Sequence, residues 1–357
     1  GVFSGVWGVS SVAGPLLGGF IVDQLSWHWI FYINVFPGLI AGALVAFAWR
    51  DQAYSHERPA VDYAGAALLS ASVVLLLLGL MELGTSQGWL FIASALILFV
   101  ILFRVERRAA DPILPLALFR DRLFSTATSH GLFTGWAVFG TISFIPLFVQ
   151  SVLGASPTQA GVTVTPMLLG WVACSIFGSR ILLKVGYRRL SIIGTSIFII
   201  GAALLAIFGA DASRIFVMVF VTLMGMGMGL SIPAYVIAVQ TTVERRHLGT
   251  ATSMLQFSRS MGGTLGISVM GAALSARLAA NLNASGLDVG LISQLLDPLS
   301  TSGGVVESGA RLAMANAVHL VFVIAFIAAA VGWVAAIFTP RKELKDDIPT
   351  VAPAIAD

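Results

Sequence analysis

Long apolar runs separated by short polar segments fill this chain. Each run holds roughly 20 residues, the length a helix needs to cross about 30 Å of hydrocarbon at about 1.5 Å per residue. Helices suit this setting because they pair every backbone group internally. The pattern predicts ten membrane spans: Val2 to Ile21, Ile30 to Ala48, Ala64 to Met81, Leu90 to Val105, Phe124 to Val149, Ala160 to Leu183, Leu190 to Ile207, Ile215 to Val239, Ala251 to Leu274 and Leu312 to Phe338.

Composition and charge agree with a membrane protein and give it an orientation. Hydrophobic residues make up 57% of the chain and charged residues 10%, which is typical of a polytopic helical membrane protein. If the first span enters from the cytoplasm, nearly all of the 20 Lys and Arg residues fall on the inner side, as the positive-inside rule requires. The exceptions are Arg214, Arg277 and Arg311 outside and Arg259 within a span. The net positive charge is therefore a topology signal, and we predict no nucleic-acid partner.

Small residues in the first span recur in the ninth. A shift of 248 residues aligns four pairs of them, and both spans enter from the cytoplasm, so the repeat is parallel, as in transporters built from two related halves. Small residues four apart on one helix face also allow a neighbouring backbone to approach closely. The spacing by itself is also explained by a generic tight packing face. The shared register of several small residues favours an internal repeat instead. The pairs are Gly1 with Gly249, Ser10 with Ser258, Gly14 with Gly262, and Gly18 with Gly266.

The first span also contains the run Gly14-Pro15-Leu16-Leu17-Gly18-Gly19. A proline inside a helix removes a backbone hydrogen bond and bends the axis, so this run predicts a kinked helix that packs closely on a partner. Gly14, Pro15, Gly18 and Gly19 resemble the antiporter motif of the major facilitator superfamily, although Ser10 stands where that pattern usually has glycine. In that family the motif seals the outer half of the helix and is associated with drug and proton antiport.

Further motifs, in the same order along the chain, resemble the fourteen-helix drug:proton antiporters of the EmrB/QacA type. The resemblance implies an all-α polytopic membrane protein with a major facilitator fold. With ten helices present, we expect an N-terminally truncated fragment that lacks the first four helices, including the proton-carrying carboxylate. The motifs are Trp27-His28-Trp29-Ile30-Phe31-Tyr32-Ile33-Asn34, Asp62-Tyr63-x-Gly65, Pro112-Ile113-Leu114-Pro115 and Gln150-x-x-x-Gly154-x-Ser156-Pro157-x-x-Ala160-Gly161.

The same resemblance implies the domain organisation. Residues 1–49 would be the last two helices of the N-terminal transporter half, and residues 50–108 an inserted helix pair. Residues 109–123 would form an amphipathic cytoplasmic linker, 124–340 the six-helix C-terminal half, and 341–357 a cytoplasmic tail. The linker is basic and amphipathic, which predicts a helix on the membrane surface, with a plain solvated linker as the alternative.

In this superfamily the substrate cavity lies near the midplane, and here the fifth and eighth spans would line it. Both spans are rich in aromatic and Met residues. Aromatic faces attract lipophilic cations, and Met side chains repack around different shapes. Lipid-facing or core packing is the alternative for each residue. The cavity candidates are His130, Phe133, Trp136, Phe139, Met224, Met228 and Tyr235.

Three polar residues are predicted to lie buried in the spans: Gln256, Arg259 and His319. A charge at that depth is unfavourable, so Arg259 is expected to face protein and to bond to carbonyls or to a polar group on a neighbouring helix. Direct substrate contact is the alternative role. His319 is expected to be a hydrogen-bonded packing residue.

The predicted function is proton-coupled multidrug efflux of lipophilic or cationic compounds across the cytoplasmic membrane by alternating access. The expected partners are a small-molecule substrate, protons and the lipid bilayer. The outer segment Ser275 to Arg311 could meet a periplasmic adaptor protein or form a lid over the cavity. No catalytic motif or metal spacing is present, so we predict no enzyme, cofactor or metal. A dedicated exporter of a metabolite, lipid or siderophore is one alternative, and a polytopic membrane sensor or enzyme is another.

Overall fold

The computed structural model describes residues 2–48, 62–108, 112–114, 116–208, 213–244, 247–284, 292, 296 and 308–341. Several sequence predictions lie outside these residues. They concern Gly1, the inner segment 50–61, the tail from residue 342, most of the outer segment from Ser275 to Arg311, and the side chain of Pro15.

Ten long helices make up most of the described residues. Nine of the ten are long and apolar enough to cross a membrane, which confirms nine of the predicted spans. The remaining helix, α1, lies where the first span is predicted. The helices are α1 (Val2–Gln24), α2 (Trp29–Ala48), α3 (Tyr63–Met81), α4 (Ser86–Glu106), α5 (Arg122–Ser151), α6 (Pro157–Val185), α7 (Tyr187–Phe208), α8 (Arg214–Thr242), α9 (Leu248–Ala284) and α11 (Ser308–Ile337), with a 3-10 turn η1 (Leu118–Arg120) before α5.

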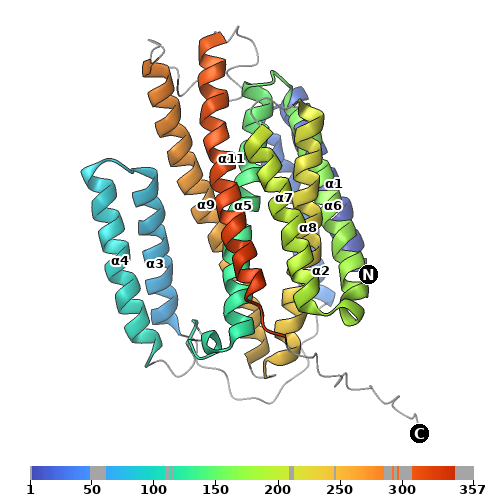
Figure 1. Ribbon diagram of the computed structural model, residues 1–357, viewed down its shortest axis with the longest axis vertical. Coiled ribbons are helices and arrows are strands. Elements are labelled where there is room, and N and C mark those ends of the chain that lie inside the picture. Colours follow the sequence, from blue (N-terminus) through green and yellow to red (C-terminus); the bar gives the residue numbers. More distant parts are fainter. Residues whose placement is uncertain are drawn as a thin grey trace.

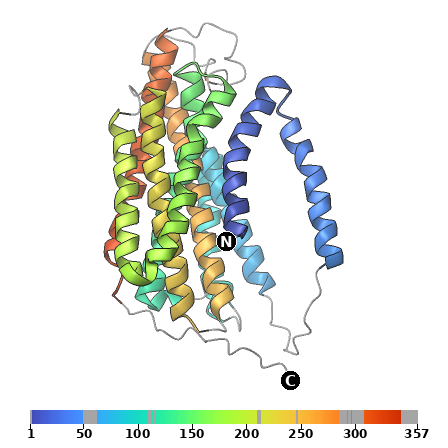
Figure 2. The same cartoon turned by 90° about the vertical axis from the view of Figure 1, so that its right-hand side faces the viewer.

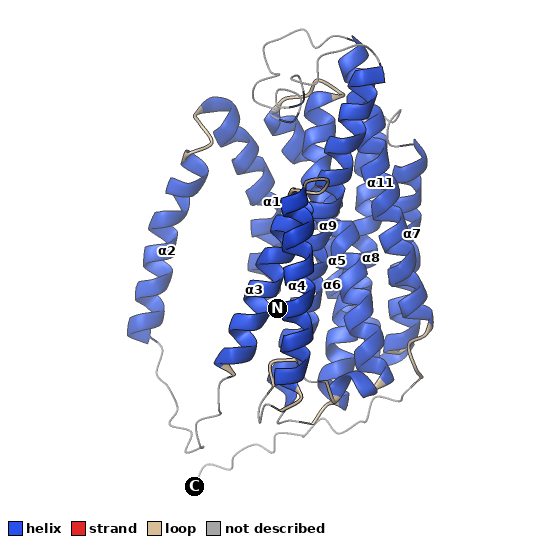
Figure 3. Cartoon of the chain, turned by 90° about the vertical axis from the view of Figure 1, so that its left-hand side faces the viewer, coloured by secondary structure: helices blue, strands red, loops and turns tan. Residues whose placement is uncertain are grey.

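The helices form a six-helix bundle with one hairpin on each of two sides. Helices α5 to α11 make up the bundle, and the α3–α4 hairpin packs beside it against α9 (Figure 1). Helix α1 packs along α6, whereas α2 lies apart from the bundle (Figures 2 and 3). None of the residues of α2 is buried by other described parts of the chain. Its apolar side chains are therefore free to meet lipid or another helix.

Two apolar clusters form the core of the bundle, one toward each end of its helices. We name these ends outer and inner after the orientation that the charge pattern predicts. The outer cluster joins all six bundle helices and includes Phe148, Phe198 and Phe322, each buried. The inner cluster includes Leu123 and Leu190, where α5, α6, α7, α8 and α9 meet. Close packing of both clusters fixes the bundle helices relative to one another.

Local sequence signals set the ends of α5 and α6. Asp121 caps α5 by accepting hydrogen bonds from the backbone N–H of Leu123 (2.8 Å) and Phe124 (3.1 Å). Ser156 and Gln159 form a capping box at the start of α6, where Pro157 occupies the first turn. The cap at Ser156 places the start of α6 beside the end of α1, where the candidate site lies.

The linker before α5 differs from the predicted surface helix. Its described residues contain only the turn η1, and the side chain of Leu114 is buried. Pro112 and Pro115 explain the difference, because a proline lacks the N–H that a helix needs and clashes with the preceding turn. The linker therefore folds back against the protein at Leu114.

Helix α9 is longer than its apolar run predicts. It holds 37 residues, which corresponds to about 55 Å at about 1.5 Å per residue. The last ten residues, 275–284, are rich in Ala and Leu, good helix formers that carry α9 past its membrane-spanning part.

Candidate functional site

The glycine motif of α1 meets the first turn of α6. A methyl group added at Gly19 would lie 2.8 Å from the Cα of Thr158 and 2.9 Å from the carbonyl oxygen of Pro157. The hydroxyl of Thr158 donates a hydrogen bond to Oδ2 of Asp23 at 2.6 Å. Gly19 and Asp23 are four residues apart and share one helix face. That face holds the outer end of α1 against α6.

Gly14 and Gly18 of the same motif make no such contact with the described part of the chain. No described atom lies within 4 Å of a methyl group added at Gly14 or Gly18. The small-residue face with Gly14 and Gly18 therefore makes no close contact within the described residues, and its close approach to another helix stays a prediction. The physical reason is rotational, since five residues turn a helix by about 140° and so separate Gly14 from the Gly19 face.

The equivalent face of α9 does pack closely. A methyl group at Gly262 would overlap the backbone of Leu132, and one at Gly266 would lie 2.8 Å from the Trp136 ring, both on α5. Ser258 on the same face is buried. The predicted close approach is confirmed for this copy of the repeat.

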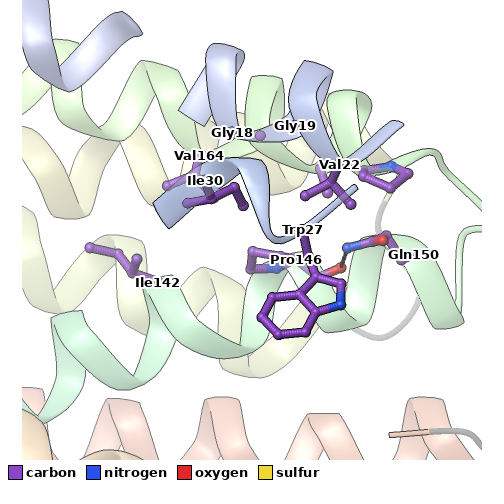
Figure 4. Close-up of a pocket in the computed structure, with 12 residues that line it drawn as sticks. Gly18, Gly19, Val22, Trp27, Ile30, Ile142, Pro146, Gln150 and Val164 are labelled. Atoms are coloured by element: carbon purple, nitrogen blue, oxygen red, sulfur yellow. Dashed lines mark hydrogen bonds between the residues drawn. The ribbon is translucent and has the colours of Figure 1, made fainter. Parts of the chain in front are cut away.

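A cavity of about 410 Å³ lies near the outer ends of the helices, between the α1–α2 hairpin and the helices α5 and α6 (Figure 4). It unites three of the sequence motifs, those that begin at Gly14, Trp27 and Gln150. Its lining residues are Gly18, Gly19, Val22, Trp27, Ile30, Ile142, Pro146, Gln150, Pro157, Ala160, Gly161 and Val164.

The chemistry of this cavity is almost wholly apolar. Among its lining residues, Trp27 supplies an indole and Gln150 an amide, and none is charged. The amide nitrogen of Gln150 donates to the carbonyl oxygen of Pro146 at 3.2 Å, which holds the side chain at the wall of the cavity (Figure 4). An apolar cavity with one aromatic face and one amide suits a lipophilic, ring-containing molecule.

Arg259 lies half-buried on α9, and its guanidinium carbon is 6.0 Å from the centroid of the Trp171 ring on α6. It also donates a hydrogen bond to Oε1 of Gln256. Its Nε is buried and has no hydrogen-bond partner within the described chain. The neighbouring helix therefore contributes an aromatic face, whereas the polar partner comes from α9 itself. Gln256 differs from its prediction, because its side chain is exposed.

Four of the seven cavity candidates lie in the core of the bundle. His130 Nε2 is 2.9 Å from the hydroxyl of Thr195, and its ring centroid is 4.6 Å from that of Tyr235. The Tyr235 hydroxyl in turn lies 2.7 Å from the hydroxyl of Thr339. Met224 and Met228 are fully buried. In this arrangement these side chains fill the interior, and their contact with substrate stays a prediction.

The other three candidates lie between α5 and its neighbours. Trp136 packs on α9, and its indole nitrogen is buried without a hydrogen-bond partner in the described part. Phe139 also packs on α9, at Gly263, and Phe133 packs near Gly332 of α11. Their role in substrate contact is likewise untested.

His319 joins α11 to α7. Its Nε2 lies 2.6 Å from the carbonyl oxygen of Ala206, within hydrogen-bond distance. This is the hydrogen-bonded packing role expected of it, and the side chain is half-buried.

The inner end of α11 is capped by the start of α7. Arg188 donates from Nε to the carbonyl oxygen of Thr339 at 2.6 Å and from Nη2 to that of Ile337 at 3.2 Å. Tyr187 donates to the carbonyl oxygen of Pro340 at 2.8 Å. A cation beside the last carbonyls of a helix stabilises that end of the helix. The inner ends of α7 and α11 are thereby fixed together.

Asp23 and Gln150 are not among the site residues that the sequence predicts. Both carried a usable signal. Asp23 follows Gly19 by one helical turn at the outer end of a span, and Gln150 opens a motif at the outer end of another. Two motifs at the same end of neighbouring spans are good candidates for one site.

Comparison with known proteins decides the family. Residues 1–267 match the Major Facilitator Superfamily. The chain belongs to the major facilitator superfamily. This confirms the predicted superfamily and fold class, and it supports the prediction of a transporter that is not an enzyme.

Members of the superfamily from Bacillus subtilis are similar to this chain. The Multidrug transporter protein MdtP is 38% identical over 284 residues, which cover 78% of this chain and 52% of that protein. Multidrug resistance protein 3 is 37% identical over 278 residues, which cover 76% and 54%. The chain thus spans about half the length of the curated relatives it matches.

A solved structure shares the fold. It is a bacterial homolog of the human lysosomal transporter Spinster, crystallised in an inward-facing and occupied conformation. The TM-score is 0.51 at 17% sequence identity, and the match covers 93% of this chain and 82% of that one. The likeness concerns the fold alone.

Proposed function

We propose that this major facilitator chain belongs to a proton-coupled efflux transporter of the fourteen-helix drug:proton antiporter type, which exports lipophilic or cationic compounds across the cytoplasmic membrane. Its ten helices correspond in this proposal to the last ten of fourteen. Helices α1 and α2 are the last two helices of the first transporter half, α3 and α4 form the inserted pair, and α5 to α11 form the second half.

The observation that carries this proposal is the contact between α1 and α6. Gly19 of the antiporter motif packs on the backbone of Thr158, and Asp23 accepts a hydrogen bond from the same residue. In the proposed arrangement these helices belong to different halves of the transporter. A contact that joins the halves at the outer surface closes the outer path, and its release opens that path.

Proton coupling is supported by the resemblance of α1 to antiporter sequences. The cavity beside this contact is apolar and carries the Trp27 ring, which suits lipophilic substrates. The two similar Bacillus proteins are named as multidrug proteins. In this proposal the outer segment from Ser275 to Arg311 meets a periplasmic adaptor protein, with a lid over the cavity as the alternative.

The experiment uses everted membrane vesicles that contain the full-length protein. After a pH gradient is established, adding tetraphenylphosphonium should release protons from the vesicles, and collapsing the gradient should stop ethidium uptake. Vesicles from cells without the protein serve as the control. Ethidium uptake that continues after the proton gradient has collapsed would contradict proton coupling.

A dedicated exporter of an anionic or acceptor-rich amphiphile is the second candidate. Arg259 favours it, because its half-buried guanidinium has an unpartnered Nε and faces an aromatic ring. An oxygen acceptor on a substrate would satisfy that donor. The same vesicle assay with a carboxylated amphiphilic dye separates the candidates, since the second predicts transport of the anion and no transport of tetraphenylphosphonium.

A further inference from the structure

Two carboxyl groups approach the same glycine, Gly65, at the inner end of the α3–α4 hairpin, and they are independent of the proposed transport function. Asp62 caps α3, and its Oδ1 accepts a hydrogen bond from the backbone N–H of Gly65 at 2.7 Å. Glu106 is the last residue of α4, and its Oε2 accepts one from the backbone N–H of Leu114 at 3.1 Å.

The second oxygen of each carboxyl group has no hydrogen-bond partner among the described residues. Asp62 Oδ2 and Glu106 Oε1 are both buried. A methyl group added at Gly65 would contact both of them, at 2.6 Å from Glu106 Oε1 and closer still to Asp62 Oδ2. The two oxygens therefore lie over the same glycine, close to one another. Only 2% of Glu106 is exposed.

Two ionised carboxylates in this position would be unfavourable. Each would be a buried, incompletely paired anion, and the two charges would repel one another. On α9, which packs against α3, the charged residues Arg259 and Arg277 make no described contact with the pair. Asp111 of the linker lies outside the described residues, and the other nearby titratable side chains are exposed: Tyr63, Arg104, Arg107 and Arg108.

A single proton removes this difficulty. One carboxyl group in the neutral form donates an O–H···O hydrogen bond to the other, so both orphan oxygens gain a partner and one negative charge disappears. A metal ion would need further oxygen ligands, and the described residues hold no group of three or more His, Cys, Asp or Glu side chains that could bind one.

The helix ends decide which residue holds the proton. Asp62 lies at the N-terminus of α3, where the helix dipole favours a negative charge. Glu106 lies at the C-terminus of α4, where the dipole disfavours one. Glu106 Oε1 is therefore the better donor and Asp62 Oδ2 the better acceptor, while Glu106 Oε2 still accepts from Leu114.

We propose that Asp62 and Glu106 form a proton-binding site that takes one proton from the cytoplasmic side and thereby fastens the α3–α4 hairpin to the linker that leads into α5. In the bound state Glu106 Oε1–H donates to Asp62 Oδ2, and no other bond changes. Release of the proton leaves two facing carboxylates, which separate the base of the hairpin.

The linker connects the base of the α3–α4 hairpin, where the proton binds, to the bundle. Leu114 bonds to Glu106, and a few residues later Phe119 packs edge-on against Phe124 of α5 with ring centroids 5.1 Å apart. The hydroxyl of Ser125 donates to the carbonyl oxygen of Phe119. The proton on the pair is thus linked through the linker to the first turn of α5.

The test is hydrogen exchange at the Leu114 amide in the purified full-length protein, measured by mass spectrometry and corrected for the intrinsic pH dependence of exchange. In the wild type, protection of this amide should fall by about tenfold as the pH is raised until the pair releases its proton, because the folded site then holds two carboxylates. Glu106→Gln should keep the high protection at every pH, since its amide donates permanently to Asp62.

Asp62→Asn is the second variant, and it keeps the cap on α3 because Asn is also a good N-cap residue. It should also remove the pH dependence, since Glu106 then faces no charge. Glu82→Gln, an exposed acid at the opposite end of the same hairpin, should leave the wild-type behaviour intact. The Gly88 amide, which donates to Thr85 Oγ1 at that end, should show no such dependence in any variant.

Three results would overturn the proposal. One is pH-independent protection of Leu114 in the wild type, and another is an unchanged pH dependence in Glu106→Gln. The third is protection that follows the concentration of Na⁺ or K⁺ at constant ionic strength and pH, which would assign the site to a metal cation.

Discussion

Arg259 is a half-buried charged side chain within the apolar part of α9, and its surroundings explain how it is tolerated. A charge near the centre of a membrane helix costs roughly 2.5 kcal/mol or more when it has no compensating contact. Here the ring of Trp171 covers the guanidinium and Gln256 accepts one of its hydrogen bonds. The side chain therefore joins α9 to α6 through an aromatic contact.

Replacing Arg259 should weaken both stability and transport. Arg259→Ala should lower the free energy of unfolding by about 1 to 2 kcal/mol, because the cation–π contact is lost. Arg259→Lys and Arg259→Gln should both reduce transport, since neither reproduces the planar guanidinium. Thermal unfolding and efflux rates of the full-length protein measure the two effects.

The matched control is Arg277→Ala, an exposed arginine on the same helix. It should change neither quantity. If Arg259→Ala accumulates, unfolds and transports like the wild type, Arg259 only reaches toward the membrane surface and its contact with Trp171 has no structural role.

At the residue scale, the sequence shows which side chains are out of place in an apolar helix, but it does not show which side chains they contact. The depth of Arg259 follows from its position in an apolar run, but the Trp171 contact depends on how α6 and α9 are rotated. The same limit applies to Met224 and Met228. Their side chains suit a flexible cavity, yet both are fully buried in this arrangement, because helix packing decides which face points inward.

At the scale of the helices, the contact of α1 with α6 depends on one glycine. A side chain at Gly19 would meet the backbone of Pro157 and Thr158, which cannot move aside as a flexible side chain does. A side chain at Gly14 would meet nothing within 4 Å in the described part of the chain. Substitutions at these two glycines of one motif are therefore expected to have different effects on transport.

Gly19→Leu should separate the outer ends of α1 and α6, and it should reduce export by about tenfold or more, because a 1.4 kcal/mol change already corresponds to a factor of ten. Gly14→Leu should insert equally well and keep most of the activity. Efflux rate and proton leak, normalised to the amount of protein in the membrane, distinguish the variants. Equal loss in both would show that α1 has a second close neighbour in the whole transporter.

Helix positions were predictable from the apolar runs, since membrane spans have a fixed minimum length. The ends of the helices were less predictable from these runs. The extension of α9 to Ala284 consists of residues that favour helix without being strongly apolar, so hydrophobicity does not reveal it. In the linker the error is the opposite one. Its amphipathic pattern predicted a helix, and Pro112 and Pro115 prevent that helix.

At the scale of the molecule, the described residues form a six-helix bundle with the α1–α2 hairpin attached through α6 and the α3–α4 hairpin attached through α9. The sequence predicted the superfamily and the ten long helices of the described residues, whereas the parallel repeat stays a prediction. It did not predict that the antiporter motif and the Gln150 motif line one cavity, because that depends on the packing of helices distant in sequence.

The central claim is that the outer contact of α1 with α6 must open and close for transport. Its most direct test is a reversible crosslink in a Cys174→Ser background. Asp23→Cys and Thr158→Cys place two thiols where the side chains now touch, so a short cleavable dithiol reagent should join α1 to α6. Glu82→Cys with Ser86→Cys, on the two sides of the α3–α4 turn, is the matched control, since that crosslink stays within one hairpin.

Efflux by the full-length protein should stop when the α1–α6 crosslink forms and should recover when the reagent is cleaved, while the control crosslink leaves efflux unchanged. Normal efflux from protein whose α1–α6 crosslink is complete would contradict the account.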